Sequence, residues 1–255
     1  MNKYHFIFDK TKSSQRLKIF FKKYKNYTIN KCNTVVVAGG DGFMLRVLKK
    51  YYRNKKPFYG INCGTIGFLM NKFHQTNLEK KIKKTKMFSI NSLVAKVQRY
   101  KKKKNITMLA INEVSLLRQS RQTAILKLKV NKKNLIKKLI SDGVLVSTPA
   151  GSTAYNLSVH GPILSLNSKK LGITPISPFR PRRWKGKIIS DKSKVIIENL
   201  NPQKRPVSVV ADNHEIRNIK KVEISVSKKV KIKLLFDKGR GLINKIKQEQ
   251  KLIIN

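Results

Sequence analysis

Hydrophobic and polar residues follow two alternating periods along the first ninety residues of the chain. Short apolar runs at residues 4–8, 34–38 and 57–61 predict strands. Between them, apolar residues fall on one helical face at residues 13–24 and again at residues 44–52. Because strands alternate with helices, residues 1–90 are predicted to form an open, Rossmann-like α/β domain.

The pattern changes near residue 88. Leu93, Ala95 and Val97 alternate with polar residues, which is typical of a strand with one buried face. The lysine run 101–104 then fits the tip of a hairpin. Further short apolar segments predict strands at residues 106–111, 114–117, 124–130, 144–146, 194–197, 207–210, 222–226 and 230–235. Such a series predicts a β-rich, sandwich-like domain over residues 91–235.

The last twenty residues return to a helical period. Leu242, Ile243 and Ile246 fall on one helical face. We expect residues 236–255 to form a C-terminal tail that packs back on the first domain.

One carboxylate stands directly behind the second predicted strand. Gly39, Gly40 and Gly42 bracket Asp41 at the carboxyl end of that strand, where α/β sheets bind their ligands. Glycine permits positive φ and close approach of a ligand, and successive free N–H groups suit phosphate. A carboxylate repels phosphate unless it holds a metal ion or accepts a proton, so the turn favours phosphoryl transfer. An ordinary glycine turn remains an alternative.

Composition narrows the class of protein. The chain has 255 residues, 40% of them hydrophobic, and a formal net charge of +46, which by itself indicates nucleic acid or an anionic surface as a partner. Only 12 of the 58 basic residues are arginine, however, and this lysine excess is typical of a solvated surface encoded by A- and T-rich codons. We therefore expect no nucleic-acid partner, although such a surface still attracts anionic nucleotides.

Cysteine usage and hydropathy exclude other classes. Cys32 and Cys63 lack a CxxC spacing and a nearby histidine pair, which excludes a disulfide framework and a zinc site. No run approaches the ~18 apolar residues of a membrane helix. We expect a cytoplasmic protein without a membrane partner.

A second motif is rich in small hydroxyl residues. Residues 141–158 lead from a strand, through a Pro and Gly turn, into a short polar helix. Ser152 and Thr153 are expected to cap this helix, and its free N–H groups with these hydroxyls suit ribose and phosphate oxygens. Tyr155 could stack on a base or offer a phenolic hydrogen bond. A well-capped turn without a ligand is the alternative.

Taken together, the motifs resemble those of the bacterial NAD kinases. The chain carries the GGDG turn at 39–42, G-x-x-G-F-L at 64–69, the pair Asn112 and Glu113, the segment 142–155 and Gly-Pro-Ile at 161–163. Residues 174–178 and 211–213 match later elements of the family. GGDG also occurs in diacylglycerol kinases and phosphofructokinases, whereas Thr-Pro-x-Gly-Ser-Thr-Ala-Tyr is characteristic of NAD kinases.

The resemblance implies an activity and a set of site residues. NAD kinases transfer the γ-phosphoryl group of ATP, or in some members of inorganic polyphosphate, to the 2′-hydroxyl of the adenosine ribose of NAD. Asp41 would accept the proton, Gly39, Gly40 and Gly42 would form the phosphate loop, and a divalent cation, with Mg²⁺ expected, would balance the triphosphate. The metal ligands are left unassigned, and a homodimer or homotetramer is expected. The implied NAD-binding residues are Asp41, Gly42, Arg46, Asn112, Glu113, Asp142, Ala150, Thr153, Ala154, Tyr155, Asn156, Leu157 and Ser158.

Three residues depart from the family pattern. Phe43 stands where many relatives have threonine, which removes one possible phosphate contact. Ala150 replaces a usual threonine and Asn156 a usual serine, although an amide can still donate and accept hydrogen bonds.

Other interpretations stay open at this stage. They are a lipid kinase of the same superfamily and a basic nucleic-acid-binding protein. The basic residues Arg180, Arg182 and Arg183 could contact a substrate phosphate or an adjacent subunit. His214 follows a segment that the family uses near its site, but we expect it to be a surface histidine.

Overall fold

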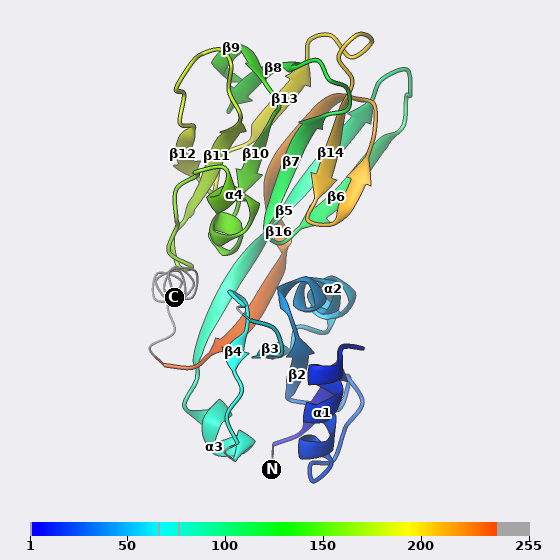
Figure 1. Cartoon of the computed structure of the whole chain (residues 1–255), viewed down its shortest axis with the longest axis vertical. Coiled ribbons are helices and arrows are strands. Elements are labelled where there is room, and N and C mark those ends of the chain that lie inside the picture. Colours follow the sequence, from blue (N-terminus) through cyan, green and yellow to red (C-terminus); the bar gives the residue numbers. More distant parts are fainter. Residues whose placement is uncertain (1, 66, 76, 239–255) are drawn as a thin grey trace. The chain divides into compact units, whose positions relative to one another are not determined.

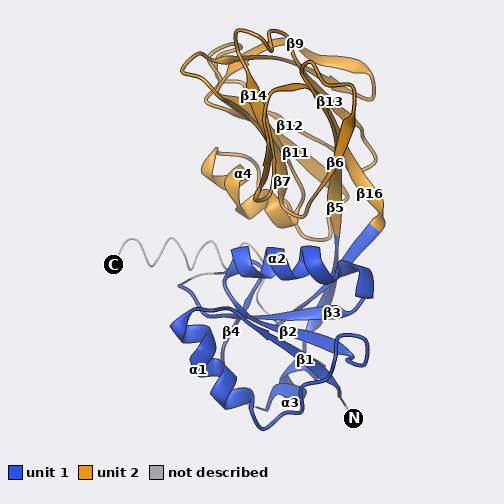
Figure 2. Ribbon diagram, turned by 90° about the vertical axis from the view of Figure 1, so that its right-hand side faces the viewer, with its two compact units in different colours: residues 1–90, 230–255 blue, residues 91–229 orange. Residues whose placement is uncertain are grey.

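The computed structural model describes residues 2–65, 67–75 and 77–238, and the chain divides into two compact units (Figures 1 and 2). Unit 1 comprises residues 1–90 together with the chain from 230 onward, and unit 2 comprises residues 91–229. The sequence pattern places residues 230–235 in the second domain. They group instead with unit 1, because the end of one long strand pairs there in parallel, through Lys233 and Leu234.

Unit 1 is an open α/β sheet, as the sequence predicts. Its elements are β1 (Tyr4–Phe8), α1 (Lys12–Phe21), β2 (Thr34–Gly39), α2 (Asp41–Tyr51), the 3₁₀ helix η1 (Tyr52–Asn54), β3 (Pro57–Asn62), β4 (Asn71–Lys72), α3 (Leu78–Lys83) and the end of β16 (Ile219–Phe236). β1, β2 and β3 pair in parallel, and β16 and β4 both pair in parallel with β3. β2 buries every residue, because helices cover both faces of the sheet. α2 covers one face, and α1 and α3 cover the other (Figure 2).

α2 buries the face that its sequence predicts, whereas Ile19 of α1 is 67% exposed. Met44, Val47 and Leu48 of α2 are buried, which confirms the predicted apolar face. Phe21, at the end of α1, stacks on Phe6 with 5.3 Å between the ring centres. The sequence pattern did not predict α3, since its six residues are too few to show a helical period.

A buried amide joins β16 to β4 along the side of β3. The Asn71 amide donates to the carbonyls of Gly60 (3.1 Å) and Leu235 (2.9 Å), and its oxygen accepts the N–H of Asp237 (2.9 Å). One side chain thus holds three strands where β16 ends and β4 begins.

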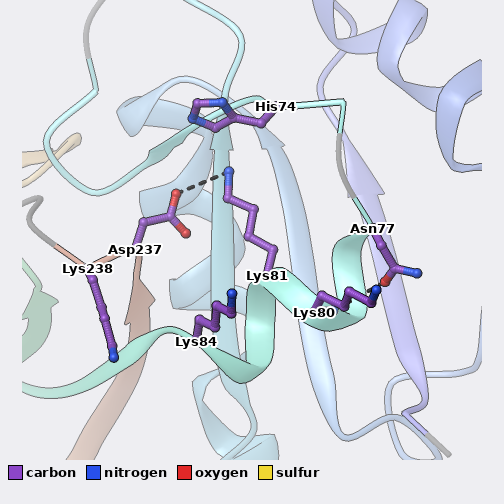
Figure 3. A pocket seen from close by; sticks show the side chains of 7 residues that line it. All are labelled: His74, Asn77, Lys80, Lys81, Lys84, Asp237 and Lys238. Atoms are coloured by element: carbon purple, nitrogen blue, oxygen red, sulfur yellow. Dashed lines mark hydrogen bonds and ion pairs between the residues drawn. The ribbon is translucent and has the colours of Figure 1, made fainter.

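The carboxylate of Asp237 belongs to the same junction. It accepts the hydroxyl of Tyr59 (3.0 Å) and pairs with the ammonium of Lys81 (3.2 Å), as Figure 3 shows for the lysine. Lys81 also donates to the carbonyl of Lys72 (3.2 Å). This ion pair borders a hollow of ≈ 460 Å³ whose other walls are mainly lysine. The contacts of Asp237 fix α3 to the sheet.

Unit 2 is a β-rich sandwich, also as predicted. Its elements are β5 (Lys86–Arg99), β6 (Asn105–Ala110), β7 (Glu113–Arg118), β8 (Ala124–Val130), β9 (Lys133–Ser141), β10 (Gly143–Ser147), the 3₁₀ helix η2 (Ala150–Thr153), α4 (Tyr155–Ser158), β11 (Lys170–Ile176), β12 (Lys187–Ser190), β13 (Val195–Asn199), β14 (Val207–Ala211), β15 (His214–Ile216) and the start of β16. One sheet has the order β12-β11-β10-β7-β14-β15. The other runs β16-β13-β8-β9, with β5 paired to β16 and β6 paired to β5. Residues of both sheets, such as Leu93, Val146 and Ile197, share one core.

Several predictions about strands can be compared directly with unit 2. The alternation of Leu93, Ala95 and Val97 is confirmed, because all three are fully buried. The lysine run 101–104 connects β5 to β6 in a hairpin, with Gln98 opposite Asn105. The two strands predicted at 222–226 and 230–235 are wrong as separate elements, since β16 continues through the polar residues between them.

Five strands were not predicted from the sequence, namely β4, β9, β11, β12 and β15. β9 carries many exposed polar residues and therefore lacks an apolar run. The helix predicted around Leu242, Ile243 and Ile246 lies outside the described residues, as does most of the predicted tail.

Candidate active site

Asp41 is the first residue of α2 and follows Gly40, the N-cap. Its carboxylate accepts two backbone N–H groups, from Phe68 to Oδ2 (2.7 Å) and from Leu69 to Oδ1 (2.9 Å). Phe68 and Leu69 belong to the G-x-x-G-F-L loop, so two separate motifs meet at one side chain. These two bonds fix the direction of the Asp41 carboxylate.

The glycines around Asp41 are small for two different reasons. A β-carbon on Gly39 would lie 2.6 Å from Cδ1 of Phe43, so that ring fills the space. At Gly40 and Gly42, apart from the adjoining residues and the backbone of α2, no atom of the described residues lies within 4 Å of where a β-carbon would be. None of the three glycines has a positive φ, so the expectation that this turn needs glycine for its backbone conformation is wrong. Gly40 and Gly42 instead leave open space beside the start of α2.

Arg46 and Phe43 lie together on the first turns of α2. The Arg46 guanidinium lies 5.5 Å from the centre of the Phe43 ring and 3.9 Å from the Asp9 carboxylate. The Arg46 side chain is 58% exposed. Both of these contacts are with residues of unit 1 and neither indicates a ligand. The role of Arg46 as an NAD-binding residue therefore stays a prediction.

In unit 2, the peptide of Asn112 is held from both sides. Asp212, in the turn between β14 and β15, accepts the N–H groups of Ile111 (2.9 Å) and Asn112 (2.8 Å). Thr148 donates its N–H to the carbonyl of Asn112 and its hydroxyl to that of Ile111, both at 2.8 Å. A β-carbon on Gly151 would lie 2.2 Å from the Asn112 carbonyl oxygen. The Asn-Glu pair and the Thr-Pro-Ala-Gly segment therefore form one cluster.

Several oxygen atoms of this cluster are buried without a hydrogen-bond partner among the residues that the structure describes. They are Asn112 Oδ1, Ser147 Oγ and Thr153 Oγ1. Ser147 lies directly opposite Glu113 in the antiparallel ladder, and the Asn112 and Glu113 residues are only 9% and 8% exposed. Because an unpaired buried polar group costs about 1–3 kcal/mol, these oxygens mark a place that a polar ligand would complete.

Ser152 does not cap a helix as expected. Its hydroxyl donates to the carbonyl of Pro149 (2.7 Å) and accepts the N–H of Leu164 (3.0 Å). Neither η2 nor α4 has a side-chain cap, and α4 has only four residues. The predicted side-chain cap at this helix start is therefore wrong, whereas binding of ribose and phosphate oxygens by this segment stays a prediction.

Asn156 also uses its polar atoms internally. The fully buried amide donates to the carbonyls of Ser152 (3.2 Å) and Pro162 (3.0 Å), and accepts the hydroxyl of Thr174 (2.7 Å). A β-carbon on Gly161 would lie 2.2 Å from Asn156 Oδ1. The side chain of Asn156 thus fixes the loop after η2, and its contact with the nucleotide stays a prediction.

Asp142 and Glu113 lie at opposite ends of one ladder. Glu113 pairs with Ser147, whereas Asp142 precedes Gly143 and forms an ion pair with Arg118 (2.6 Å). At ~3.3 Å per residue the two ends are roughly 13 Å apart along the strand, so Asp142 is not part of the Asn112 cluster.

Burial and the negative charges of Asp142 and Glu113 all affect the pKa of the Tyr155 phenol. Burial raises the pKa of its phenol, and the charges of Asp142 and Glu113 raise it further. The phenol therefore stays protonated in the neutral range and is a hydrogen-bond donor.

Two family models match this chain. The ATP-NAD kinase N-terminal domain matches residues 4–88, and the ATP-NAD kinase C-terminal domain matches residues 111–236. The chain belongs to the NAD kinase family. A phosphotransferase activity follows from this membership, and the lipid kinase and nucleic-acid-binding interpretations are not favoured.

Curated relatives support the same family. The chain is 44% identical to the NAD kinase of Zymomonas mobilis over 94% of this chain and 92% of that protein. It is 44% identical to the NAD kinase of Hyphomonas neptunium over 89% of both chains.

Solved NAD kinase structures share the fold. An NAD kinase from Archaeoglobus fulgidus, in complex with ATP, has a TM-score of 0.76 at 22% identity and covers 96% of this chain and 98% of that one. Yeast NADH kinase, in complex with NADH, has a TM-score of 0.74 at 24% identity, with 86% of this chain and 66% of that one covered.

The other predicted NAD-binding residues of this NAD kinase differ in exposure. Ala150 is buried, Ala154 and Leu157 are half-buried, and Ser158 is exposed. Ser158 lines a hollow of ≈ 590 Å³ in unit 2 that also includes Trp184.

The arginines of residues 180–183 contact residues close to them in the sequence or line a hollow of unit 2. The guanidinium groups of Arg180 and Arg182 lie 5.5 Å and 5.6 Å from the centre of the exposed Phe179 ring. Arg183 lines the same hollow as Ser158, and His214 is exposed. Among the described helices, none is long and apolar enough to cross a membrane.

The residues that hold the site together were not predicted from the sequence. No local pattern assigned a role to Asp212, Thr148 or Gly151, nor to the N–H groups of Phe68 and Leu69. The motifs that contain them were visible, but nothing in a local pattern shows which distant motif each contacts.

Proposed function

We propose that this NAD kinase transfers the γ-phosphoryl group of ATP to the 2′-hydroxyl of the adenosine ribose of NAD, forming NADP. The observation that carries the proposal is a carboxylate, Asp41, oriented by two backbone N–H groups beside Gly40 and Gly42, which leave open space. Such a turn brings a proton acceptor next to a place where phosphate can approach the backbone.

Asp41 would act as the general base. It would accept the proton of the 2′-hydroxyl while that oxygen forms its bond to the γ-phosphorus and the bond from phosphorus to ADP breaks. Proton transfer to a positioned carboxylate contributes about 10²- to 10⁴-fold in rate. The bonds from Phe68 and Leu69 support this role, because they fix the direction of the carboxylate.

The phosphates would lie against the start of α2. This helix has eleven residues, and its first N–H groups have no side-chain cap. The positive end of a helix dipole stabilises anions. We assign Gly39, Gly40 and Gly42 to the phosphate loop, with Gly39 acting through its packing on Phe43.

The ribose and dinucleotide would be bound by the Asn112 cluster. Asn112 and Thr153 offer buried oxygens, Glu113 offers a carboxylate that suits vicinal hydroxyls, and Tyr155 offers a phenolic O–H. We retain Asp142, Ala150, Ala154, Leu157 and Ser158 as proposed dinucleotide contacts, and assign Asn156 to the support of their loop.

A divalent cation would neutralise part of the triphosphate charge. In the described part of the chain, no three histidine, cysteine or acidic side chains gather as a metal cage. Mg²⁺ is commonly held by one or two carboxylates, water and substrate phosphates, so it needs no such cage, and its ligands in this chain stay unassigned. Use of polyphosphate, assembly of two or four copies and a cytoplasmic location stay predictions.

The decisive test is an NADP-forming assay on the purified protein with ATP, GTP and polyphosphate compared side by side. We expect NADP from NAD and ATP, and no phosphorylation of diacylglycerol. Asp41→Asn should lower kcat at least about a hundredfold, since an amide cannot accept the proton. Asp191→Asn, in a turn of unit 2, is the matched control. Full turnover by the Asp41 variant would remove its assigned role.

A further inference from the structure

We propose that Asp212 is a positioning residue for NAD binding. It acts through the backbone of residues 111–113 and does not itself touch the substrate. This inference rests on the proposed function of Asn112 and Glu113 as dinucleotide-binding residues.

The Asp212 carboxylate receives N–H groups from two consecutive residues. Ile111 donates to both oxygens (3.1 and 2.9 Å), and Asn112 donates to Oδ1 (2.8 Å). The backbone N–H of Asp212 donates back to the carbonyl of Glu113 (3.2 Å). All three residues of the segment are therefore bonded to this one aspartate.

The hairpin supplies Asp212 in a fixed conformation. Ala211 pairs with His214, so Asp212 and Asn213 form the two-residue turn between β14 and β15. Asp212 has φ 55, a left-handed conformation that aspartate tolerates better than most residues. β14 in turn pairs with β7, the strand that Glu113 begins. The carboxylate is thus carried by the neighbouring strand of the same sheet.

A negatively charged acceptor suits this position. Both carboxylate oxygens accept N–H groups from the backbone of Ile111 and Asn112. An asparagine would turn one oxygen into an NH₂ group that faces a donor. Hydrogen bonds to a charged group are roughly twice as strong as those between neutral groups.

Both backbone polar groups of Asn112 have partners within the protein. Its side-chain oxygen, Oδ1, is left for a ligand. Thr148 binds the carbonyl of Asn112, and Asp212 binds its N–H. Asn112 Oδ1 is buried and has no partner among the described residues. Its direction is set by the backbone, so loosening the bond to Asp212 would misplace this oxygen and the adjacent Glu113.

The test compares Asp212→Asn with Glu215→Gln, an exposed acid on the same hairpin. We expect Asp212→Asn to raise the KM for NAD about tenfold and to change the KM for ATP less than about twofold, because interaction energies of about 1.4 kcal/mol correspond to a factor of ten. Glu215→Gln should change neither. A purely structural role would lower the amount of active enzyme, and hence the apparent kcat, without this selective effect on NAD.

A double-mutant cycle separates this inference from the proposed function. If Asp212 acts through the segment, Asp212→Asn adds little to the NAD defect of Glu113→Ala. An unchanged KM for NAD in Glu113→Ala alone would overturn the proposed acceptor site. A normal KM for NAD in Asp212→Asn, or additive defects, would overturn the positioning role. If Asp212→Asn fails to fold, Asp212→Glu keeps the charge but displaces the oxygens, and the same NAD-selective rise is expected.

Discussion

At the scale of single residues, glycine has several distinct functions in this protein. Gly151 is small because the backbone of Asn112 occupies the space of a side chain, and Gly161 because Asn156 does. Gly40 and Gly42 have no neighbour of the described chain in that space. Because no side chain of the described residues accounts for these two glycines, we propose that a ligand approaches their backbone.

Gly42→Ala and Gly151→Ala should therefore have opposite effects on stability. Gly42 lies in the first turn of α2 and has open space, so alanine should leave stability unchanged or raise it by up to about 1 kcal/mol, the helix-propensity difference. The same substitution should raise the KM for ATP. Alanine at 151 would clash with the Asn112 carbonyl and should destabilise the fold by at least about 1–3 kcal/mol.

Urea denaturation and substrate titrations of both variants check these expectations. A loss of stability in Gly42→Ala with normal ATP binding would show that the glycine serves the fold and not the phosphates.

At the scale of elements, the edge of the unit 1 sheet depends on one buried side chain. β16 and β4 occupy successive stretches beside β3, and Asn71 links all three through its amide. Asp237 and Lys81 then attach α3 to this junction. Among the described residues, no other buried side chain makes these hydrogen bonds at the end of β16 or at the start of β4.

Asn71→Ala should cost about 2–4 kcal/mol, because it leaves two buried carbonyls and one N–H without their partner. The free energy of unfolding from urea titration measures this. Asn30→Ala, which removes only an exposed hydrogen bond to Asn54, is the control and should cost less than about 0.5 kcal/mol. Equal effects of the two variants would contradict the structural role of the junction.

At the scale of the whole molecule, the few acidic residues are informative. The chain has 12 acidic residues against 58 basic ones. Several of them make specific internal contacts, among them Asp41 with the loop of Phe68, Asp212 with Asn112, and Asp237 with Tyr59. The lysines are spread over the surface of both units. A net charge of +46 therefore produces a long-range field that attracts anionic substrates.

The KM for ATP should rise several-fold between about 50 and about 300 mM NaCl, because salt screens charges more than about 10 Å apart. The KM for NAD should rise less, since NAD carries less negative charge than ATP. Steady-state kinetics with potassium acetate as a second salt checks that the effect is general. Equal or absent salt effects on the two substrates would show that the surface charge does not contribute to binding.

The sequence by itself determined the fold class, the family and the place of Asp41. Apolar runs and helical faces are local patterns, so the α/β character of unit 1 and the β-rich character of unit 2 could be predicted from them. The GGDG turn and the Thr-Pro-x-Gly-Ser-Thr-Ala-Tyr segment are contiguous, and the resemblance rested on them. Elements without an apolar run, such as β9 and α3, could not be predicted in this way.

Only the tertiary structure decided which motifs meet and which side chains face inward. Asp212 binds Asn112 from 100 residues away along the chain, and Leu69 binds Asp41 from 28 away. The three hydrogen-bond partners of Asn156 were not visible in the sequence, and Asp142 proved to lie at the far end of the ladder from Glu113. These facts depend on strand register and on the neighbours of each strand, which are fixed by packing across the whole chain and not by any local run of residues.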